Sequence, residues 1–406
     1  MSHWKTFTAA PHRMMMFGGT LQLVLSLLYW ATALAARETG LDLRLEGVFP
    51  GTWAHGYLML YGLFPFFIFG FLMTTYPRWM NGPLVERSRY VAAFLCMATG
   101  MSLVYIGLFT HVALIGLGAL LHACGWGIGL SELYRVFRTA TNRMKTHERF
   151  LNAYLLIGGL GMLAFAFGVL LNVPAAIQLA LTLGLWGFLL PVMITVAHRM
   201  LPFFSSNVIK PYEIYSPDWV LTALPILIAG HVVLDLAGLW QWRFLFDAPL
   251  AGIAFYLSWR WGLARSFQAR LLAVLHVAFL WFGIGMALYA LDSLLLLTNA
   301  GFALGRAPLH ALGIGLIASM TIAMASRVTL GHSGRPLVAD TLVWLVGWSL
   351  HLTALLRVLG ELPIPDGSLF LSLNLLAALL WLASVVPWAV RFGPMYLLPR
   401  IDGRPG

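Results

Sequence analysis

The sequence predicts an all-α, polytopic membrane protein with about twelve transmembrane helices and both termini in the cytoplasm. Hydrophobic residues make up 60% of the 406 residues and charged residues only 10%, whereas soluble globular proteins are about 25% charged. Apolar runs follow one another along the chain, and each is long enough to span a bilayer, which takes about 20 residues. Basic residues collect in alternate connections, as the positive-inside rule requires.

The apolar runs define the individual helices. Inside lipid the backbone has no water to bond with, so each run is expected to form a helix that satisfies its own N–H and C=O groups. The predicted helices are 14–36, 52–76, 89–110, 111–131, 150–172, 176–198, 217–239, 244–264, 270–297, 307–329, 337–359 and 368–392.

Lysine and arginine residues set the orientation. With the N-terminus in the cytoplasm, 20 of the 25 basic residues fall on the cytoplasmic side and five on the outer side, and an even helix count returns the C-terminus to the cytoplasm. The net charge of +10 therefore reports topology and gives no reason to expect nucleic acid. The chain, 1–406, is expected to be one transmembrane domain. The five outer residues are Arg37, Arg44, Arg243, Arg306 and Arg357.

Two polar stretches interrupt the apolar pattern. Residues 132–149 (ELYRVFRTATNRMKTHER) are expected to form a cytoplasmic connection that either anchors the topology or binds a partner, and the positive-inside rule favours anchoring. Residues 199–218 contain three prolines and are expected to break into an interfacial turn.

The histidines are the most informative residues. There are twelve, and most fall inside predicted helices, where a polar group is costly and usually faces the bundle interior. A single intramembrane histidine commonly makes a helix–helix hydrogen bond. The large number of histidines also indicates metal binding, because neutral imidazole is a ligand of haem iron and of copper.

The predicted topology divides the histidines between two leaflets. His55 and His310 begin helices at the outer face, and His231 lies in the outer third of its helix. His310 and His332 are 22 residues apart, about 30 Å along a straight helix, so they cannot share one metal. The sequence thus predicts two separate sites. The inner candidates are His198, His276 and His332.

Other polar groups accompany the outer histidines. Asp235 follows His231 by four residues on the same helical face, and a carboxylate one turn away commonly orients a ligand histidine. Arg306 and Arg357 lie near the same face, where guanidinium groups either bind haem propionates or snorkel to the interface. No C-x-x-C-H motif is present, so a non-covalent haem b is expected rather than a c-type haem.

Four blocks of the sequence resemble the NnrS family of twelve-helix bacterial inner-membrane proteins. They are WAHGYLMLYGLFPFFIFGFLMTTYPRW (53–79), AHRMLPFFSSNVI (197–209), LLAVLHVAFLWFGIGMAL (271–288) and HALGIGLIASMTIAMASRVTLGHSGRPL (310–337). The family is described as containing haem and copper and is linked to the nitric oxide response in denitrification and nitrosative stress. The positions that carry over are His55, Arg199, His276, His310, Arg327 and His332, with His198 matching a common variant.

The first block departs from the family pattern. Family members often have Trp-His-Ala-His-Glu, whereas this chain has Trp53-Ala54-His55-Gly56. One histidine and the glutamate are missing, so no role of those two groups carries over. His55 matches the second histidine of the motif.

The resemblance implies a haem protein, with copper as a further cofactor, that binds or detoxifies nitric oxide in the bacterial inner membrane. We predict His55 and His310 as axial haem ligands, Arg306 and Arg357 as propionate partners, and an inner copper site built on His276. No catalytic residue or electron donor is assigned. The other metal candidates are His198 and His332 for the inner site and His231 for the outer leaflet.

Two other classes of function also fit the sequence. A transporter of a metal or a metal–nitrosyl species would use His231 and Asp235 as a proton or ion relay. A nitric oxide sensor or assembly protein would bind without turnover. A coloured purified protein separates a haem protein from a transporter, and nitric oxide consumption separates an enzyme from a sensor.

The predicted helices 52–76 and 307–329 resemble each other. Each begins near a histidine at the outer face and ends toward an arginine, Arg78 or Arg327, that precedes a Gly-Pro-containing turn. Duplication or chance explains this similarity. In the second turn, GHSGRP (331–336), Gly331 and Gly334 are expected to end the helix, and His332 is either functional or structural.

Overall fold

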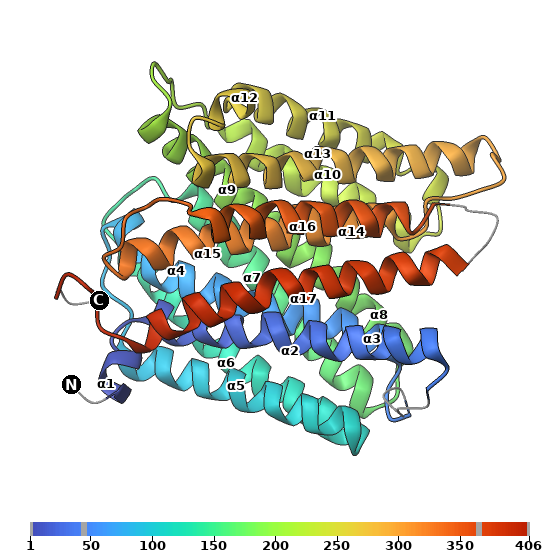
Figure 1. The fold of residues 1–406 in the computed structure, drawn as a ribbon, viewed down its shortest axis with the longest axis horizontal. Coiled ribbons are helices and arrows are strands. Elements are labelled where there is room, and N and C mark those ends of the chain that lie inside the picture. Colours follow the sequence, from blue (N-terminus) through green and yellow to red (C-terminus); the bar gives the residue numbers. More distant parts are fainter. Residues whose placement is uncertain (1–2, 42–46, 363–367, 404–406) are drawn as a thin grey trace. The chain divides into compact units, whose positions relative to one another are not determined.

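The computed structural model describes residues 3–41, 47–362 and 368–403, which form helices without any β-strand (Figure 1). The chain divides into two compact units. Unit 1 comprises Met1–Val192, Val328–Pro336 and Ala389–Gly406, and unit 2 comprises Met193–Arg327 and Leu337–Trp388. The expected single domain stays a prediction.

Unit 1 contains most of the N-terminal half of the chain. Long apolar helices alternate with short ones, and η1 and η2 are π-helical. Its elements are α1 His3–Phe7, α2 Pro11–Thr39, α3 Gly51–Tyr57, η1 Leu58–Leu63, α4 Phe64–Met80, α5 Arg87–Phe109, α6 Val112–Thr139, α7 Thr146–Leu170, α8 Pro174–Thr182 and η2 Leu183–Leu189.

Unit 2 also combines long apolar helices with short ones. It includes a π-helical segment, η4, and a short 3-10 turn, η3. Helices α9, α15 and α17 contribute residues to both units. The helix α9 runs to Val208, so the predicted turn at 199–218 is limited to residues 209–217. The elements are α9 Leu190–Val208, α10 Asp218–Leu236, η3 Trp240–Trp242, α11 Phe244–Arg260, α12 Leu263–Ser266, α13 Arg270–Leu297, α14 Ala307–His310, η4 Ala311–Ala318, α15 Ser319–His332, α16 Thr341–Leu359 and α17 Ser368–Leu397.

The all-α, multi-pass class is confirmed. Eleven helical segments of the described chain are long and apolar enough to cross a membrane. The twelfth predicted run, 244–264, forms α11, which has 17 residues and ends at Arg260. Gly262 follows with φ of 85°, a left-handed conformation that glycine adopts readily and that interrupts the helix. The length of α11 is therefore about 26 Å, slightly less than a hydrocarbon core of about 30 Å.

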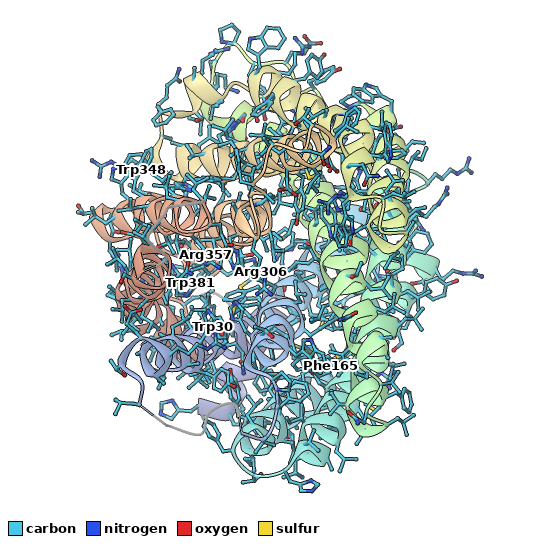
Figure 2. All side chains as sticks on the ribbon, turned by 90° about the vertical axis from the view of Figure 1, so that its right-hand side faces the viewer. Trp30, Phe165, Arg306, Trp348, Arg357 and Trp381 are labelled. Carbon is cyan, nitrogen blue, oxygen red and sulfur yellow. The ribbon has the colours of Figure 1, made fainter. Side chains whose placement is uncertain are left out.

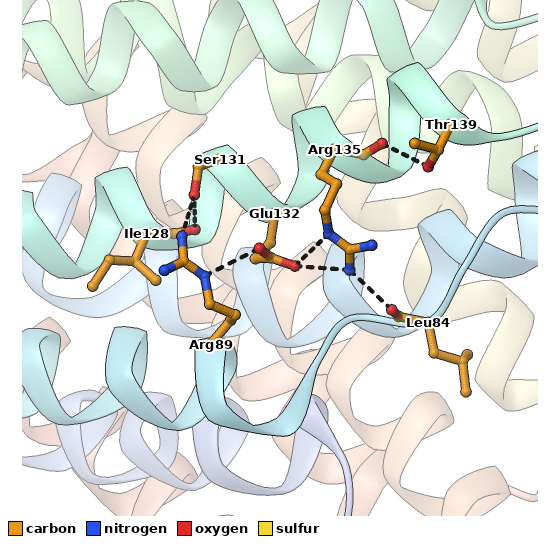
Figure 3. A network of polar contacts seen from close by, with 7 residues as sticks. All are labelled: Leu84, Arg89, Ile128, Ser131, Glu132, Arg135 and Thr139. Carbon is orange, nitrogen blue, oxygen red and sulfur yellow. Dashed lines mark hydrogen bonds and ion pairs between the residues drawn. The ribbon is translucent and has the colours of Figure 1, made fainter.

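The predicted polar connection at 132–149 is largely helical. It contributes the end of α6 and the start of α7, so only residues 140–145 lie between the helices. Within this stretch, Glu132 is buried in α6 and forms ion pairs with Arg89 at 3.1 Å and Arg135 at 2.9 Å (Figure 3). These contacts tie α5 to α6 and favour the anchoring interpretation of this basic stretch.

Both termini of the described chain lie at the same end of the helices of unit 1 (Figure 1). This placement agrees with the predicted even number of spans. The distribution of basic residues predicts that this end faces the cytoplasm. Of the residues used for orientation, Arg44 and Arg404 lie outside the described residues, as does the C-terminal Gly406.

Helices α5 and α6 pack closely because glycines face each other. A Cβ atom at Gly100 would lie 2.6 Å from the backbone oxygen of Gly118, and one at Gly118 would lie 2.6 Å from that of Gly100. Small residues allow the close backbone approach that drives helix association in lipid. Large apolar side chains such as Ile106 and Leu156 are exposed, as expected of a surface that faces acyl chains.

Candidate functional site

His55 and His310 occupy equivalent places in two similar segments. His55 lies in α3 shortly before η1, and His310 ends α14 directly before η4. Such π-helical segments are rare and often occur at functional sites. The two segments also end alike, at Asn81 and Gly334, whose φ angles are 50° and 78°. The similarity suggested by the sequence therefore extends to the backbone.

The ring of His310 is oriented by its own helix. Its Nδ1 atom lies 2.9 Å from the backbone oxygen of Arg306. A carbonyl oxygen only accepts hydrogen bonds, so Nδ1 carries the proton and Nε2 of the neutral ring carries the lone pair. Metal-ligating histidines commonly have this arrangement, in which the second ring nitrogen donates to a carbonyl or carboxylate.

Arg306 and Arg357, both labelled in Figure 2, contact Glu361. The Nη2 atom of Arg357 lies 2.7 Å from Oε1 of Glu361, and the backbone N–H of Arg306 donates to Oε2 at 3.2 Å. The Nη1 atom of Arg357 is buried and has no hydrogen-bond partner within the described chain. Arg357 therefore does not snorkel to solvent and keeps a buried donor.

His55 is oriented by an aromatic ring. It stacks on Trp30 of α2, with ring centroids 4.2 Å apart and planes 17° apart. The guanidinium of Arg37 lies 5.2 Å from the centroid of the same indole. His55 belongs to unit 1 and His310 to unit 2, so their pairing on one haem stays a prediction.

His231 is bonded to a different carboxylate from the one we expected. Its Nδ1 atom lies 2.6 Å from Oδ1 of Asp247 in α11, and both side chains are fully buried. Asp235, the expected partner, instead pairs with Arg243 at 2.7 Å, and Arg243 also reaches Asp292 at 3.2 Å. The expectation was wrong because it considered only the helix that carries His231, whereas the partner comes from a neighbouring helix.

The three inner candidates have different neighbours. His276 in α13 is buried, and its Nε2 atom lies 2.8 Å from the hydroxyl of Ser205 in α9. His198, also buried in α9, has its ring 6.2 Å from that of Trp261. Both belong to unit 2, whereas His332 belongs to unit 1. The hydrogen bond to Ser205 gives His276 a structural role, and the copper site stays a prediction.

His332 packs against His12, which the sequence analysis missed. Their ring centroids are 4.3 Å apart. His12 lies in the first turn of α2, which begins at Pro11 rather than at residue 14. The overlooked signal was this proline, because proline is favoured at the first position of a helix.

Two further buried histidines were not selected from the sequence. His122 in α6 lies 3.4 Å from the Tyr57 hydroxyl through Nδ1. His351 in α16 has no hydrogen-bond partner on either ring nitrogen among the residues that the structure describes. Across the same residues, no three or more His, Cys, Asp or Glu side chains are grouped so that they could hold a metal ion. A haem needs no such group, because one or two axial ligands suffice.

The GHSGRP segment closes α15. The N–H of Arg335 donates to the oxygen of Leu330 at 2.9 Å, and the N–H of Gly334 donates to that of Gly331 at 3.3 Å. These two bonds, with Gly334 at φ of 78°, form a Schellman motif. The role expected for Gly334 is confirmed, whereas Gly331 lies inside the helix.

A family model described as NnrS protein matches residues 6–400. No match was found among the curated proteins. The matched region includes both segments with a histidine before a π-helix. The long apolar helices make the chain a multi-pass membrane protein, and the family relates it to the nitric oxide response. The chain belongs to the NnrS family.

Proposed function

We propose that this protein binds haem b in the bacterial inner membrane and uses it to bind or detoxify nitric oxide. His310 would hold the haem iron permanently, and His55 would be the ligand that gives way to nitric oxide. The observation that carries the proposal is the hydrogen bond from Nδ1 of His310 to the carbonyl of Arg306, because it places the lone pair on Nε2. Ferrous haem iron would supply the position at which nitric oxide binds. Nitric oxide is apolar enough to arrive through lipid.

Arg357 is the proposed partner of a haem propionate. Its buried Nη1 atom has no partner within the described residues, and leaving such a donor unsatisfied costs about 1–3 kcal/mol. A carboxylate would remove this cost through a charge-assisted bond. Arg306, whose side chain is exposed near Glu361, is the second proposed partner.

The contact of His55 with Trp30 suits a displaceable ligand. Stacking sets the plane of the imidazole ring, but aromatic pairs contribute only about 0.5–1.5 kcal/mol. Losing the stack on Trp30 would therefore cost little. His310, by contrast, is held by a hydrogen bond to its own helix.

We also propose copper as a second metal, at His276 with His198 in unit 2. Two neutral imidazoles suit copper. Copper at His276 would replace the hydrogen bond to Ser205. His332 is the less favourable partner, because three arginines act on it electrostatically and oppose a metal cation.

The experiment is an absorption spectrum of the purified full-length protein in detergent, oxidised and reduced, with iron and copper analysis. We expect a haem b spectrum, about one iron per chain, and a spectral shift on adding nitric oxide. The matched control is His111→Asn, because His111 is exposed and caps α6 through Nδ1, a role that asparagine can fill. A colourless protein without iron would contradict the proposal.

A second function, transport of a metal or a metal–nitrosyl species, is favoured by one observation in unit 2. The Oδ2 atom of Asp247 is buried and has no hydrogen-bond partner in the described part of the chain, and such an oxygen can take a proton or a cation. Metal uptake into vesicles that Asp247→Asn abolishes, in a colourless protein, would support transport. Nitric oxide binding without consumption at an electrode would indicate a sensor.

A further inference from the structure

Five basic side chains of unit 1 interact near the start of α2. The ribbon of Figure 1 shows both termini at this end of the unit. His12 and Arg13, in the first turn of α2, are each only 3% exposed. His332, the last residue of α15, packs on His12. Arg78 near the end of α4 and Arg400 after α17 act electrostatically on both imidazoles. Five basic side chains from four segments therefore form one cluster, which we call the basic cluster.

The charge of the basic cluster is not balanced. Arg400 is paired with Asp402, whose oxygens lie 2.9 Å from Nε and 2.6 Å from Nη2. Arg13 donates from Nη1 to two backbone carbonyls at 3.2 and 2.8 Å. Within residues 3–41, 47–362 and 368–403, no carboxylate pairs with Arg13 or Arg78. Three guanidinium groups and one carboxylate leave a net charge of +2 (3 − 1), without counting the two imidazoles.

Two buried nitrogens of the cluster have no partner in the described chain: Nε of Arg13 and Nδ1 of His12. An arginine at a membrane surface normally extends its charge into water, but Arg13 is 97% shielded from it (100 − 3). Buried charges in native proteins are paired or otherwise compensated. A role as a topology anchor therefore does not explain why the charge of Arg13 is buried. A bound anion at this position would explain it, because the anion would compensate the charge.

The backbone adds to the positive potential. The helix α2 has 29 residues, and its N-cap, Ala10, supplies no side-chain hydrogen bond to the first turn. The positive end of the helix dipole thus lies beside His12 and Arg13 and favours a negative charge. The helix dipole thus adds to the positive potential that the guanidinium groups create.

We propose that the basic cluster binds a phosphate-class oxyanion, held by Arg13, Arg78 and His12. Guanidinium forks match the oxygens of such an anion, and the charge-assisted bonds would satisfy the buried nitrogens. Two sources offer this chemistry at the cytoplasmic surface, namely inorganic phosphate and the phosphate of an anionic lipid headgroup. The site involves neither predicted axial haem ligand, so it is independent of the proposed function.

The first test is calorimetry and thermal unfolding of the purified full-length protein in an uncharged detergent. Inorganic phosphate is added at constant ionic strength, with chloride as the reference anion. We expect phosphate, but not chloride, to bind and to raise the unfolding temperature. Arg78→Gln, an exposed position, should weaken phosphate binding about tenfold, the loss of one charge-assisted bond. Arg138→Gln is the matched control, because Arg138 is an exposed basic residue in the last turn of α6.

Native mass spectrometry distinguishes the two sources. An anionic lipid that stays bound to the parent protein and to Arg138→Gln, but is lost from Arg78→Gln and His12→Gln, identifies a lipid headgroup as the occupant. Phosphate binding without retained lipid identifies the free anion. Equal phosphate responses in Arg78→Gln and Arg138→Gln, with no retained lipid, would overturn the proposal. Copper binding that depends on His12 and His332, without any phosphate response, would overturn it as well.

Discussion

The Nδ1 atom of His310 and the backbone oxygen of Arg306 are 2.9 Å apart, so the imidazole donates a hydrogen bond to the preceding turn of its own chain. The bond selects the tautomer with its lone pair on Nε2. It also restrains the ring at the start of a π-helical segment. In this tautomer, Nε2 of the neutral ring is the nitrogen that could bind a metal.

Substitution of His310 is expected to remove haem. His310→Ala should lose most of the bound haem or change its spin state. His55→Ala should keep haem with an altered spectrum, because we propose His55 as the displaceable ligand. Absorption spectroscopy and haem quantification check both variants, and added imidazole should partly restore the spectrum of His310→Ala. If both variants bind haem with the spectrum of the parent protein, the ligands lie elsewhere, and His276 is the next candidate.

Arg357→Gln is expected to weaken haem retention about tenfold, because it removes a charge-assisted donor to a propionate. The rate of haem transfer to an apo-globin measures this effect. The control is Glu361→Gln, which removes the ion pair of Arg357 but leaves its guanidinium in place. Equal haem loss from both variants would show that the ion pair, and not a propionate contact, matters.

His276→Ala is expected to lose copper and to retain haem. Ser205→Ala should keep copper, since it removes only the hydroxyl that bonds to His276. Analysis of the copper and iron content of the purified variants tests this prediction. Unchanged copper in His276→Ala would shift the assignment to His231 and His351.

Asp247→Ala is expected to lower the free energy of unfolding by about 1–3 kcal/mol, because it leaves the buried Nδ1 of His231 without its hydrogen-bond partner. Asp235→Ala should cost about 1 kcal/mol or less, since Arg243 keeps its contact with Asp292 and Asp235 is partly exposed. Thermal unfolding in detergent compares the two variants. Similar losses would mean that the His231–Asp247 pair contributes little.

Both termini are expected to face the cytoplasm. Reporter fusions before Lys5 and after Gly406 test this, because alkaline phosphatase is active only outside and green fluorescent protein fluoresces only inside. A periplasmic C-terminus would mean an odd number of spans and would reverse the depth assigned to the later histidines.

The sequence by itself determined the all-α membrane class, the positions of the spans and the shared side of the termini. These properties depend on hydrophobic run length and on the placement of charge, both of which are local. It also located the histidine segments at His55 and His310 and the glycine, Gly334, of the motif that follows the end of α15. In each case the signal is contained in a few consecutive residues.

Only the tertiary structure decided which polar groups meet. His231 pairs with Asp247 rather than Asp235, His276 bonds to Ser205, and His12 packs on His332. Each pair joins residues of different helices. Periodicity identifies neighbours within one helix but not between helices, and a buried polar group takes the partner that helix packing brings within hydrogen-bonding distance.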